Sequence, residues 1–262
     1  MKKIMLLLFL VVGIVSLGGC TNSSQDSLEY VKDKGTLVIG VTDFPPMGYL
    51  EGGETVGFDI DLATLVASEL GVDLVIQYID WDSKVFELES RAIDCIWNGM
   101  TITDERKTQM TFSNKYLDNN LIILTKLNSP IDTLADLTGK VVGVESSSSG
   151  ELAVRANTNL FNSLSGLDLY GTSSEALMAL EGGSIDAVVV DEIYARYYVL
   201  KNSNNYEIGT QIVGVEEYGI GFRLQDVSLC QEVDDIIDRL AEEGKIETIS
   251  IKWFGVNLFN RD

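Results

Sequence analysis

The chain alternates short strand-like runs with helix-like runs, and this alternation restricts it to an α/β fold. Residues 36–41 (TLVIGV) form a β-branched run, and residues 58–70 place apolar side chains at helical spacing before Gly71. Further strands are expected at residues 72–79 and 93–97. The first part of the chain therefore predicts one series of strands and helices.

The pattern restarts after two short strands expected at residues 110–112 and 121–125, which have little helix between them. The second series of helices and strands is expected at residues 134–137, 139–144, 149–157, 167–170, 174–180, 185–190 and 191–200. Residues 218–222 predict a final strand, and residues 230–253 predict two helices broken at Gly244. Two such series separated by short strands predict two lobes joined by extended crossings, with a ligand cleft between the lobes.

The beginning of the chain has the order of an export signal. A basic start is followed by an apolar core at residues 4–17 and by small residues that lead to Cys20. This core is shorter than the roughly 20 apolar residues that span a bilayer permanently. The ending resembles the lipobox of bacterial lipoproteins, in which the cysteine is lipidated after removal of the signal, here residues 1–19. An ordinary cleaved signal is the alternative. We expect a protein outside the cytoplasm, anchored to the cell membrane through Cys20, with residues 20–27 as a flexible tether.

The composition of the remaining chain excludes several functions. The formal charge of −21 becomes −23 once Lys2 and Lys3 leave with the signal. Phosphate backbones repel such a chain, so we expect no binding of nucleic acid. The chain contains no histidine, the commonest general base and zinc ligand. Cys95 and Cys230 have no metal-ligand spacing, and whether they pair in a disulfide stays open. We expect no metal and no cofactor.

The strongest chemical motif is residues 98–107 (NGMTITDERK), which follows a predicted strand. Thr103 suits the N-cap of a short helix. Arg106 lies three residues past this cap, where a cation opposes the helix dipole unless an anion binds there as well. An arginine can hold a carboxylate through two parallel hydrogen bonds. The alternative is a surface arginine that pairs with Glu105 or Glu87.

Several other short motifs follow one another along the chain. They occupy residues 40–47 (GVTDFPPM), 57–63 (GFDIDLA), 99–107 (GMTITDERK), 112–113 (FS) with Tyr116, 139–144 (GKVVGV), 185–191 (IDAVVVD) and 252–255 (KWFG). In order and spacing they resemble the bacterial extracellular solute-binding proteins that serve ABC importers of polar amino acids. The resemblance covers nearly all of the expected mature domain. It implies a two-lobed, type II periplasmic-binding-protein-like fold, in which each lobe is a mixed sheet flanked by helices and two hinge strands join the lobes. Lobe 1 is expected at residues 28–117 plus 218–262, and lobe 2 at residues 118–217.

The same resemblance implies roles for four polar residues of the cleft. Arg106 would hold the α-carboxylate of the ligand, helped by the hydroxyl and amide of Thr101. The carbonyl of Gly99 would accept the α-ammonium, and Asp191 would complete its charge. An aspartate at the end of a buried strand needs a cation or helix amides nearby. The alternative for Asp191 is the N-cap of the following helix, and the two roles are compatible.

Further contacts are implied on both sides of the ligand. Phe44 and Trp81 match positions where family members place aromatic rings against it, although Phe44 could also serve core packing. The amides of Ser148 and Ser149 would approach the carboxylate from the second lobe. A plain turn with an N-cap is the alternative for this serine-rich loop.

Specificity for the side chain of the ligand stays open at this stage. Thr42 and Asp43 fall where some family members place a selecting acid, and Glu145 departs from the usual family residue. Asp43 and Glu145 would favour a polar or cationic ligand if they face the cleft. Exposure to solvent is the alternative for both acids.

The resemblance implies a monomeric, extracytoplasmic, lipid-anchored binding protein of an ABC importer. Its partners would be an amino acid and the permease subunits. The amino acid would bind to one lobe first, and closure would bring the second lobe over it. A sensor that presents its closed state to a membrane receptor is an alternative from another class. A small-carboxylate lyase or dehydratase on the same fold, with Glu145 or Glu175 as the acid, is a third possibility.

Overall fold

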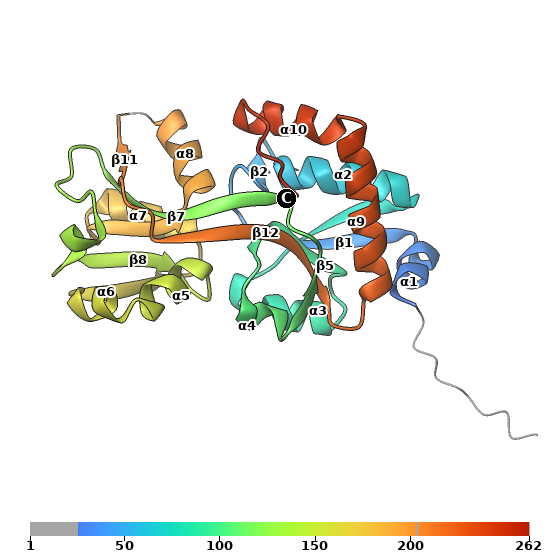
Figure 1. The fold of residues 1–262 in the computed structure, drawn as a ribbon, viewed down its shortest axis with the longest axis horizontal. Coiled ribbons are helices and arrows are strands. Elements are labelled where there is room, and N and C mark those ends of the chain that lie inside the picture. The colour runs from blue at the N-terminus through green and yellow to red at the C-terminus, as the bar shows by residue number, and fades with distance from the viewer. Residues whose placement is uncertain (1–25, 203, 262) are drawn as a thin grey trace, which may run out of the picture.

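The computed structural model describes residues 26–202 and 204–261, and it has two halves joined by long strands (Figure 1). One half contains the first part of the chain and its C-terminal helices. Its strands are β1 (Thr36–Val41), β2 (Tyr49–Glu51), β3 (Glu54–Val56), β4 (Asp73–Tyr78), β5 (Cys95–Thr101) and β6 (Met110–Phe112). Its helices are α1 (Ser27–Lys34), α2 (Phe58–Leu70), η1 (Trp81–Ser83), α3 (Lys84–Glu89), α4 (Asp104–Lys107), α9 (Val227–Glu242) and α10 (Lys245–Phe254).

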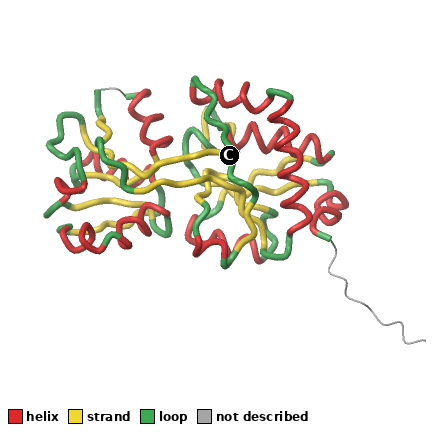
Figure 2. The backbone as a smooth tube through the Cα atoms, in the orientation of Figure 1, coloured by secondary structure: helices red, strands yellow, loops and turns green. Residues whose placement is uncertain are grey.

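The other half is formed by the middle of the chain (Figure 1). Its strands are β8 (Val141–Glu145), β9 (Gly166–Tyr170), β10 (Ala187–Asp191) and β11 (Tyr206–Ile208). Its helices are η2 (Leu134–Leu137), α5 (Ser149–Ala156), α6 (Thr158–Ser163), α7 (Ser173–Gly182) and α8 (Glu192–Lys201). Figure 2 shows strands along the middle of both halves and helices on the outside.

The two halves are connected through β7 (Leu117–Lys126) and β12 (Gly214–Arg223), which pair antiparallel. The pairing runs from Leu117 opposite Tyr218 to Leu121 opposite Gly214, and it contains the extended crossings expected from the sequence. On one side lie the parallel neighbours β4, β1 and β5, and on the other side the parallel neighbours β10, β8 and β9. A mixed sheet thus continues through both halves, and the carboxyl ends of β5 and β10 meet the crossings.

The first helix of the described chain begins at Ser27. Asp26 caps α1, because its carboxylate accepts the amides of Leu28 and Glu29. Ser27 is buried, and its hydroxyl lies 2.9 Å from that of Ser228 in α9. The predicted tether 20–27 therefore extends too far at its C-terminal end, since Ser27 belongs to a packed helix. The predicted signal 1–19 and the lipid attachment at Cys20 lie outside the described residues.

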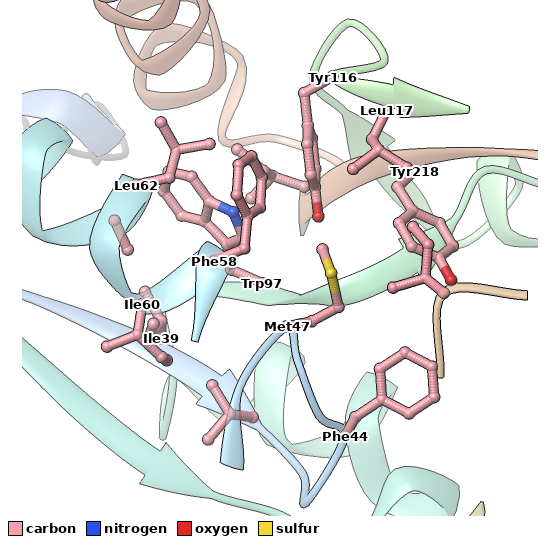
Figure 3. Close-up of a cluster of buried hydrophobic side chains, with 14 of the residues drawn as sticks. Ile39, Phe44, Met47, Phe58, Ile60, Leu62, Trp97, Tyr116, Leu117 and Tyr218 are labelled. Carbon is pink, nitrogen blue, oxygen red and sulfur yellow. The ribbon is translucent and has the colours of Figure 1, made fainter. Parts of the chain in front are cut away.

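The core of the first half forms beneath α2. Figure 3 shows Phe58 and Leu62 of this helix beside Trp97 of β5, with Tyr116 next to them. The rings of Phe58 and Tyr116 are stacked with their centroids 6.3 Å apart. Gly57 precedes the helix with a φ of 149°, and a Cβ there would lie 2.1 Å from the carbonyl oxygen of Met47. This packing fixes the segment that leads from β1 toward the cleft.

Most predicted elements are present, including the break between α9 and α10 at Gly244. The β2–β3 hairpin, the strand β11 and the helices α1, η1, α3 and α6 were not expected, and β7 and β12 each begin four residues before the predicted strand. Helix α6 starts anew because Asn157 accepts the amide of Leu160 as an N-cap. Cys95 and Cys230 are both buried and free, so they form no disulfide. Within the described ranges, no helix is long and apolar enough to cross a membrane.

Candidate functional site

A cavity of about 30 Å³ lies between the two halves of the molecule. The residues that line it come from both halves: Thr42, Phe44, Trp81, Asn98, Gly99, Thr101 and Arg106 from the first, and Glu145, Ser148, Ser149 and Asp191 from the second. Nine of the ten residues that the sequence predicted for ligand binding are therefore brought together. Asp43 is the exception.

Arg106 is held inside the protein, with only 4% of its surface exposed. Its backbone amide donates to the hydroxyl of Thr103, which caps α4 as predicted. The guanidinium donates to the carbonyl of Thr101 at 2.8 Å and to the carbonyl of Ser147, from the opposite half, at 3.3 Å. Burial lowers the pKa of Arg106, yet an arginine stays charged in proteins. Arg106 is buried and its guanidinium donates to backbone carbonyls, so it is not a surface arginine that pairs with Glu105 or Glu87.

Gly99 occupies a position that only glycine fits well. Its φ is +57°, and a Cβ would lie 3.1 Å from the ring of Phe44 and 3.2 Å from that of Tyr218. Figure 3 shows Phe44 and Tyr218 on the same side of the cluster, next to Met47. The backbone therefore turns at Gly99 directly against the aromatic wall of the cavity.

Two buried polar side chains hold this turn in place, and sequence reasoning missed the role of both. The carboxylate of Asp59 accepts the amide of Gly99 at 2.6 Å, and burial raises the pKa of Asp59 to about 7. The side-chain oxygen of Asn98 accepts the amide of Thr42 at 2.7 Å. The acid within the GFD motif at residues 57–59 was the available signal for Asp59.

Asp191 lies at the end of β10, at the N-cap position of α8, but its side chain makes no capping bond. Its Oδ1 instead accepts hydrogen bonds from Asn119 at 2.7 Å and from the hydroxyl of Tyr218. Both donors come from the strands that join the halves. Burial, followed by the negative charge of Glu216, raises the pKa of Asp191 well above its ordinary value. A cation in the cavity would stabilise this carboxylate.

The start of α5 faces Thr101 across the cavity. Ser148 caps the helix by accepting the amide of Glu151, and Ser149 Oγ lies 3.2 Å from Thr101 Oγ of the other half. The first amides of a helix have no partner within the helix and attract anions. The serine-rich loop therefore caps α5 and also lines the cavity.

Two aromatic side chains of the first half, Phe44 and Trp81, also line the cavity. Phe44 stacks on Tyr194 of α8, with ring centroids 5.3 Å apart, and it is also part of the core. Trp81 is 9% exposed, and its ring lies 5.6 Å from the Arg106 guanidinium and 4.7 Å from the ammonium of Lys84. At these distances both cations make favourable cation–π interactions with the Trp81 ring. Both rings form flat, rigid surfaces beside the polar groups.

The two candidate selecting acids differ in position. Glu145 lines the cavity, and its Oε2 accepts the amide and the hydroxyl of Ser173 at 3.1 and 2.6 Å. Burial raises the pKa of Glu145 to about 7. Asp43 is exposed and accepts the hydroxyl of Ser174 in α7, so its predicted place in the cavity is not observed. Thr42 is buried in the cavity lining, whereas Asp43 lies at a bend just after β1 and is exposed.

Comparison with known proteins places this geometry in a family. The family model of bacterial extracellular solute-binding proteins, family 3, matches residues 37–256. The chain belongs to this family. The L-cystine-binding protein TcyJ of Escherichia coli strain K12 is 31% identical over 242 residues, which cover 90% of this chain and 89% of that protein. The arginine-binding extracellular protein ArtP of Bacillus subtilis is 31% identical over 257 residues, or 97% of this chain and 98% of that protein.

Solved structures agree with the assignment. A substrate-binding protein of an ABC uptake transporter from Streptococcus pneumoniae, with bound histidine, superposes with a TM-score of 0.88. It is 36% identical in sequence, and the match covers 91% of this chain and 100% of that chain. The fold is thus the two-lobed type II fold of periplasmic binding proteins, as predicted. The family consists of binding proteins rather than enzymes. In the described part of the chain, no group of His, Cys, Asp or Glu side chains could hold a metal ion.

Proposed function

We propose that this protein is the extracytoplasmic substrate-binding component of an ABC importer and that it binds a polar amino acid between its lobes. The observation that carries the proposal is the presence of Arg106 and Asp191 in the lining of one cavity. One is a buried cation and the other is an acid without an ion pair among the described residues. A free amino acid offers the matching pair of charges.

The polar groups divide into two sets around such a zwitterion. The α-carboxylate would lie against the Arg106 guanidinium, the Thr101 hydroxyl and the first amides of α5 beyond Ser148. The α-ammonium would lie between the Asp191 carboxylate and the Gly99 carbonyl. Charge-assisted hydrogen bonds of this kind are about twice as strong as neutral ones.

Closure of the lobes is supported by the position of the cavity and by the contacts across it. Residues of both halves line the cavity, so an amino acid held there would touch both lobes. Entry and release of the amino acid would then require the lobes to separate. We assign lobe 1 to residues 28–117 plus 218–262 and lobe 2 to residues 118–217, with the β7–β12 pair between them. The contacts that link the lobes beside the cavity include Thr101–Ser149, Arg106–Ser147 and Phe44–Tyr194.

The side chain of the ligand is expected to be polar or cationic. Glu145 supports this, because its carboxylate lines the cavity. Relatives named for binding arginine, histidine and cystine, all of them polar ligands, support it as well.

The location and the partners follow from the beginning of the chain and from the family. We propose that residues 1–19 are removed as a signal and that lipidated Cys20 anchors a monomer to the cell membrane. The closed lobes would then present the amino acid to the permease subunits.

A thermal-shift screen against the twenty amino acids, ornithine and cystine tests the proposal. A ligand that binds only the folded protein raises the melting temperature by mass action. We expect one or a few polar L-amino acids to raise it and Asp191→Asn to abolish the rise. Asp43→Asn is the matched control, because Asp43 is an exposed acid near the same cleft and should leave the rise intact. No rise with any compound, or equal rises in both variants, would contradict the proposal.

A further inference from the structure

Asp191 has a second acid beside it that the binding scheme does not use. Glu216 lies on β12 and is 6% exposed. The side-chain nitrogen of Asn119 donates to Asp191 at 2.7 Å and to Glu216 at 3.0 Å. The amide oxygen of Asn119 accepts the backbone N–H of Ile193 at 3.4 Å, which orients the nitrogen toward the two acids. One amide group thus holds a buried carboxylate, that of Glu216, close to a half-buried one, that of Asp191.

The charges around this pair do not balance. The ionisable groups that face it are Arg106 from α4, Tyr218 from β12 and Glu145 from β8. In the described part of the chain, neither Asp191 nor Glu216 forms an ion pair, and the hydrogen bonds of Arg106 go to backbone carbonyls. Two desolvated carboxylates at such a site resist simultaneous ionisation, as in other carboxylate pairs that share one proton. Consistent with this, burial and the charge of Glu216 raise the pKa of Asp191.

We propose that Asp191 and Glu216 share one proton before the ligand binds and that the α-ammonium of the amino acid takes the place of this proton. The inference rests on the proposed function, because it requires an ammonium at Asp191. On binding, the O–H bond of the protonated acid breaks and the proton passes to the solvent. The ammonium keeps all its protons, and both acids become carboxylates beside it. Glu216 acts through Asp191 and is therefore a positioning residue.

A pH dependence of affinity follows from this exchange. Ligand binding competes with protonation of the pair, so affinity rises with pH as long as the unliganded pair holds its proton. By linkage, the rise is at most about tenfold per pH unit. Affinity levels off once the unliganded pair is fully ionised.

Isothermal titration calorimetry in two buffers of different ionisation enthalpy counts the protons that binding releases. L-Arginine, L-histidine, L-glutamine and L-cystine are each titrated into the whole protein at pH 6, 7 and 8. Three forms are compared: the unchanged protein, Glu216→Gln and Glu217→Gln. Glu217 is the matched control, because it is the next residue on β12 and its side chain is 53% exposed. Since each amino acid is the same throughout, its own titration cancels between variants.

We expect the unchanged protein and Glu217→Gln to release up to one proton more per bound amino acid than Glu216→Gln. We also expect the unchanged protein to release protons at the lower pH values with any amino acid that binds, which keeps the inference testable even if Glu216→Gln does not fold. Equal release from the unchanged protein and Glu216→Gln at all three pH values overturns the inference, as does the absence of release from the unchanged protein at every pH. Both results leave the binding heat, and hence the proposed function, intact. Absence of binding heat with all four amino acids overturns the proposed function and the inference together.

Discussion

At the scale of single residues, Asp59 shows how a buried acid can serve the site from outside the cavity. Its carboxylate accepts the Gly99 amide and so holds the backbone turn at Gly99, the residue whose carbonyl is proposed to accept the ammonium. Burial raises the pKa of Asp59 from 3.8 to about 7. The folded protein therefore binds more protons at this group than the unfolded chain between these two pH values.

This shift predicts how stability depends on pH. Because the folded-state pKa is raised, the contribution of Asp59 to the free energy of unfolding falls as the pH rises from about 4 to about 7, and it stays constant above. The loss is on the order of 4 kcal/mol at most. Asp59→Asn keeps an oxygen for the Gly99 amide but does not titrate, so the decline should be smaller in this variant. Urea denaturation at pH 5 and pH 8 measures it, and an equal decline in both proteins would contradict the assignment.

The sequence could predict the roles of residues that lie together in one short motif. Arg106, Thr101 and Gly99 lie in one stretch of nine residues, and a cation after an N-cap already indicates an anion site. Asn98, Asn119 and Glu216 carry no such local signal, because their roles depend on contacts between segments 56, 72 and 97 positions apart. Thr42 and Asp43 were both predicted for the cavity, and only Thr42 lines it, because the chain bends at Asp43 and leaves that side chain exposed.

At the scale of elements, the end of β5 contributes Asn98, Gly99 and Thr101 to the lining of the cavity. Every residue of this strand is buried, and it reaches the cavity through a left-handed turn at Gly99. The turn brings the backbone against Phe44 and Tyr218 before α4 presents Arg106. A side chain at Gly99 would strain the backbone, because φ is positive there, and it would crowd the rings of Phe44 and Tyr218.

We therefore expect Gly99→Ala to lower the free energy of unfolding by more than the roughly 1–2 kcal/mol of left-handed strain alone. Gly139→Ala is the matched control, because Gly139 has a φ of +72° and a Cβ added there would meet no atom within 4 Å. Chemical denaturation of both variants isolates the cost of crowding Phe44. Gly99→Ala should also weaken amino acid binding, and equal losses of stability in the two variants would contradict this account.

Helix ends and strand interiors were predictable because their signals are local. Gly71 and Gly244 end or separate helices as expected, and the apolar run before Asp191 forms a buried strand. The β2–β3 hairpin was missed because its strands are only three residues long each. The full length of β12 was missed because Gly214 to Glu217 become a strand only by pairing with β7.

At the scale of the whole molecule, the β7–β12 pair is the connection about which the lobes are proposed to move. Contacts across the cavity, such as Thr101–Ser149, can form only when the lobes approach each other. An amino acid that touches both lobes favours the closed arrangement.

Small-angle X-ray scattering should therefore report a smaller radius of gyration when a binding amino acid is present. The same amino acid should leave the radius of gyration of Asp191→Asn unchanged, because this variant lacks the second-lobe charge. An unchanged radius in the unmodified protein, with an amino acid that raises its melting temperature, would count against closure.

The central claim is that Arg106 holds the α-carboxylate, and a cycle of matched ligands and variants tests it most directly. Calorimetry compares L-arginine with agmatine and L-histidine with histamine, which each lack the one α-carboxylate, and L-cystine with cystamine, which lacks both. Each pair is titrated into the unchanged protein and into Arg106→Ala. Truncating one partner of a buried, hydrogen-bonded charge pair typically costs about 2–5 kcal/mol. For whichever amino acid binds, we predict that the unchanged protein prefers it over its amine by at least about 30-fold and that Arg106→Ala removes most of this preference. An equally tight amine, or a preference that survives undiminished in Arg106→Ala, would contradict the claim.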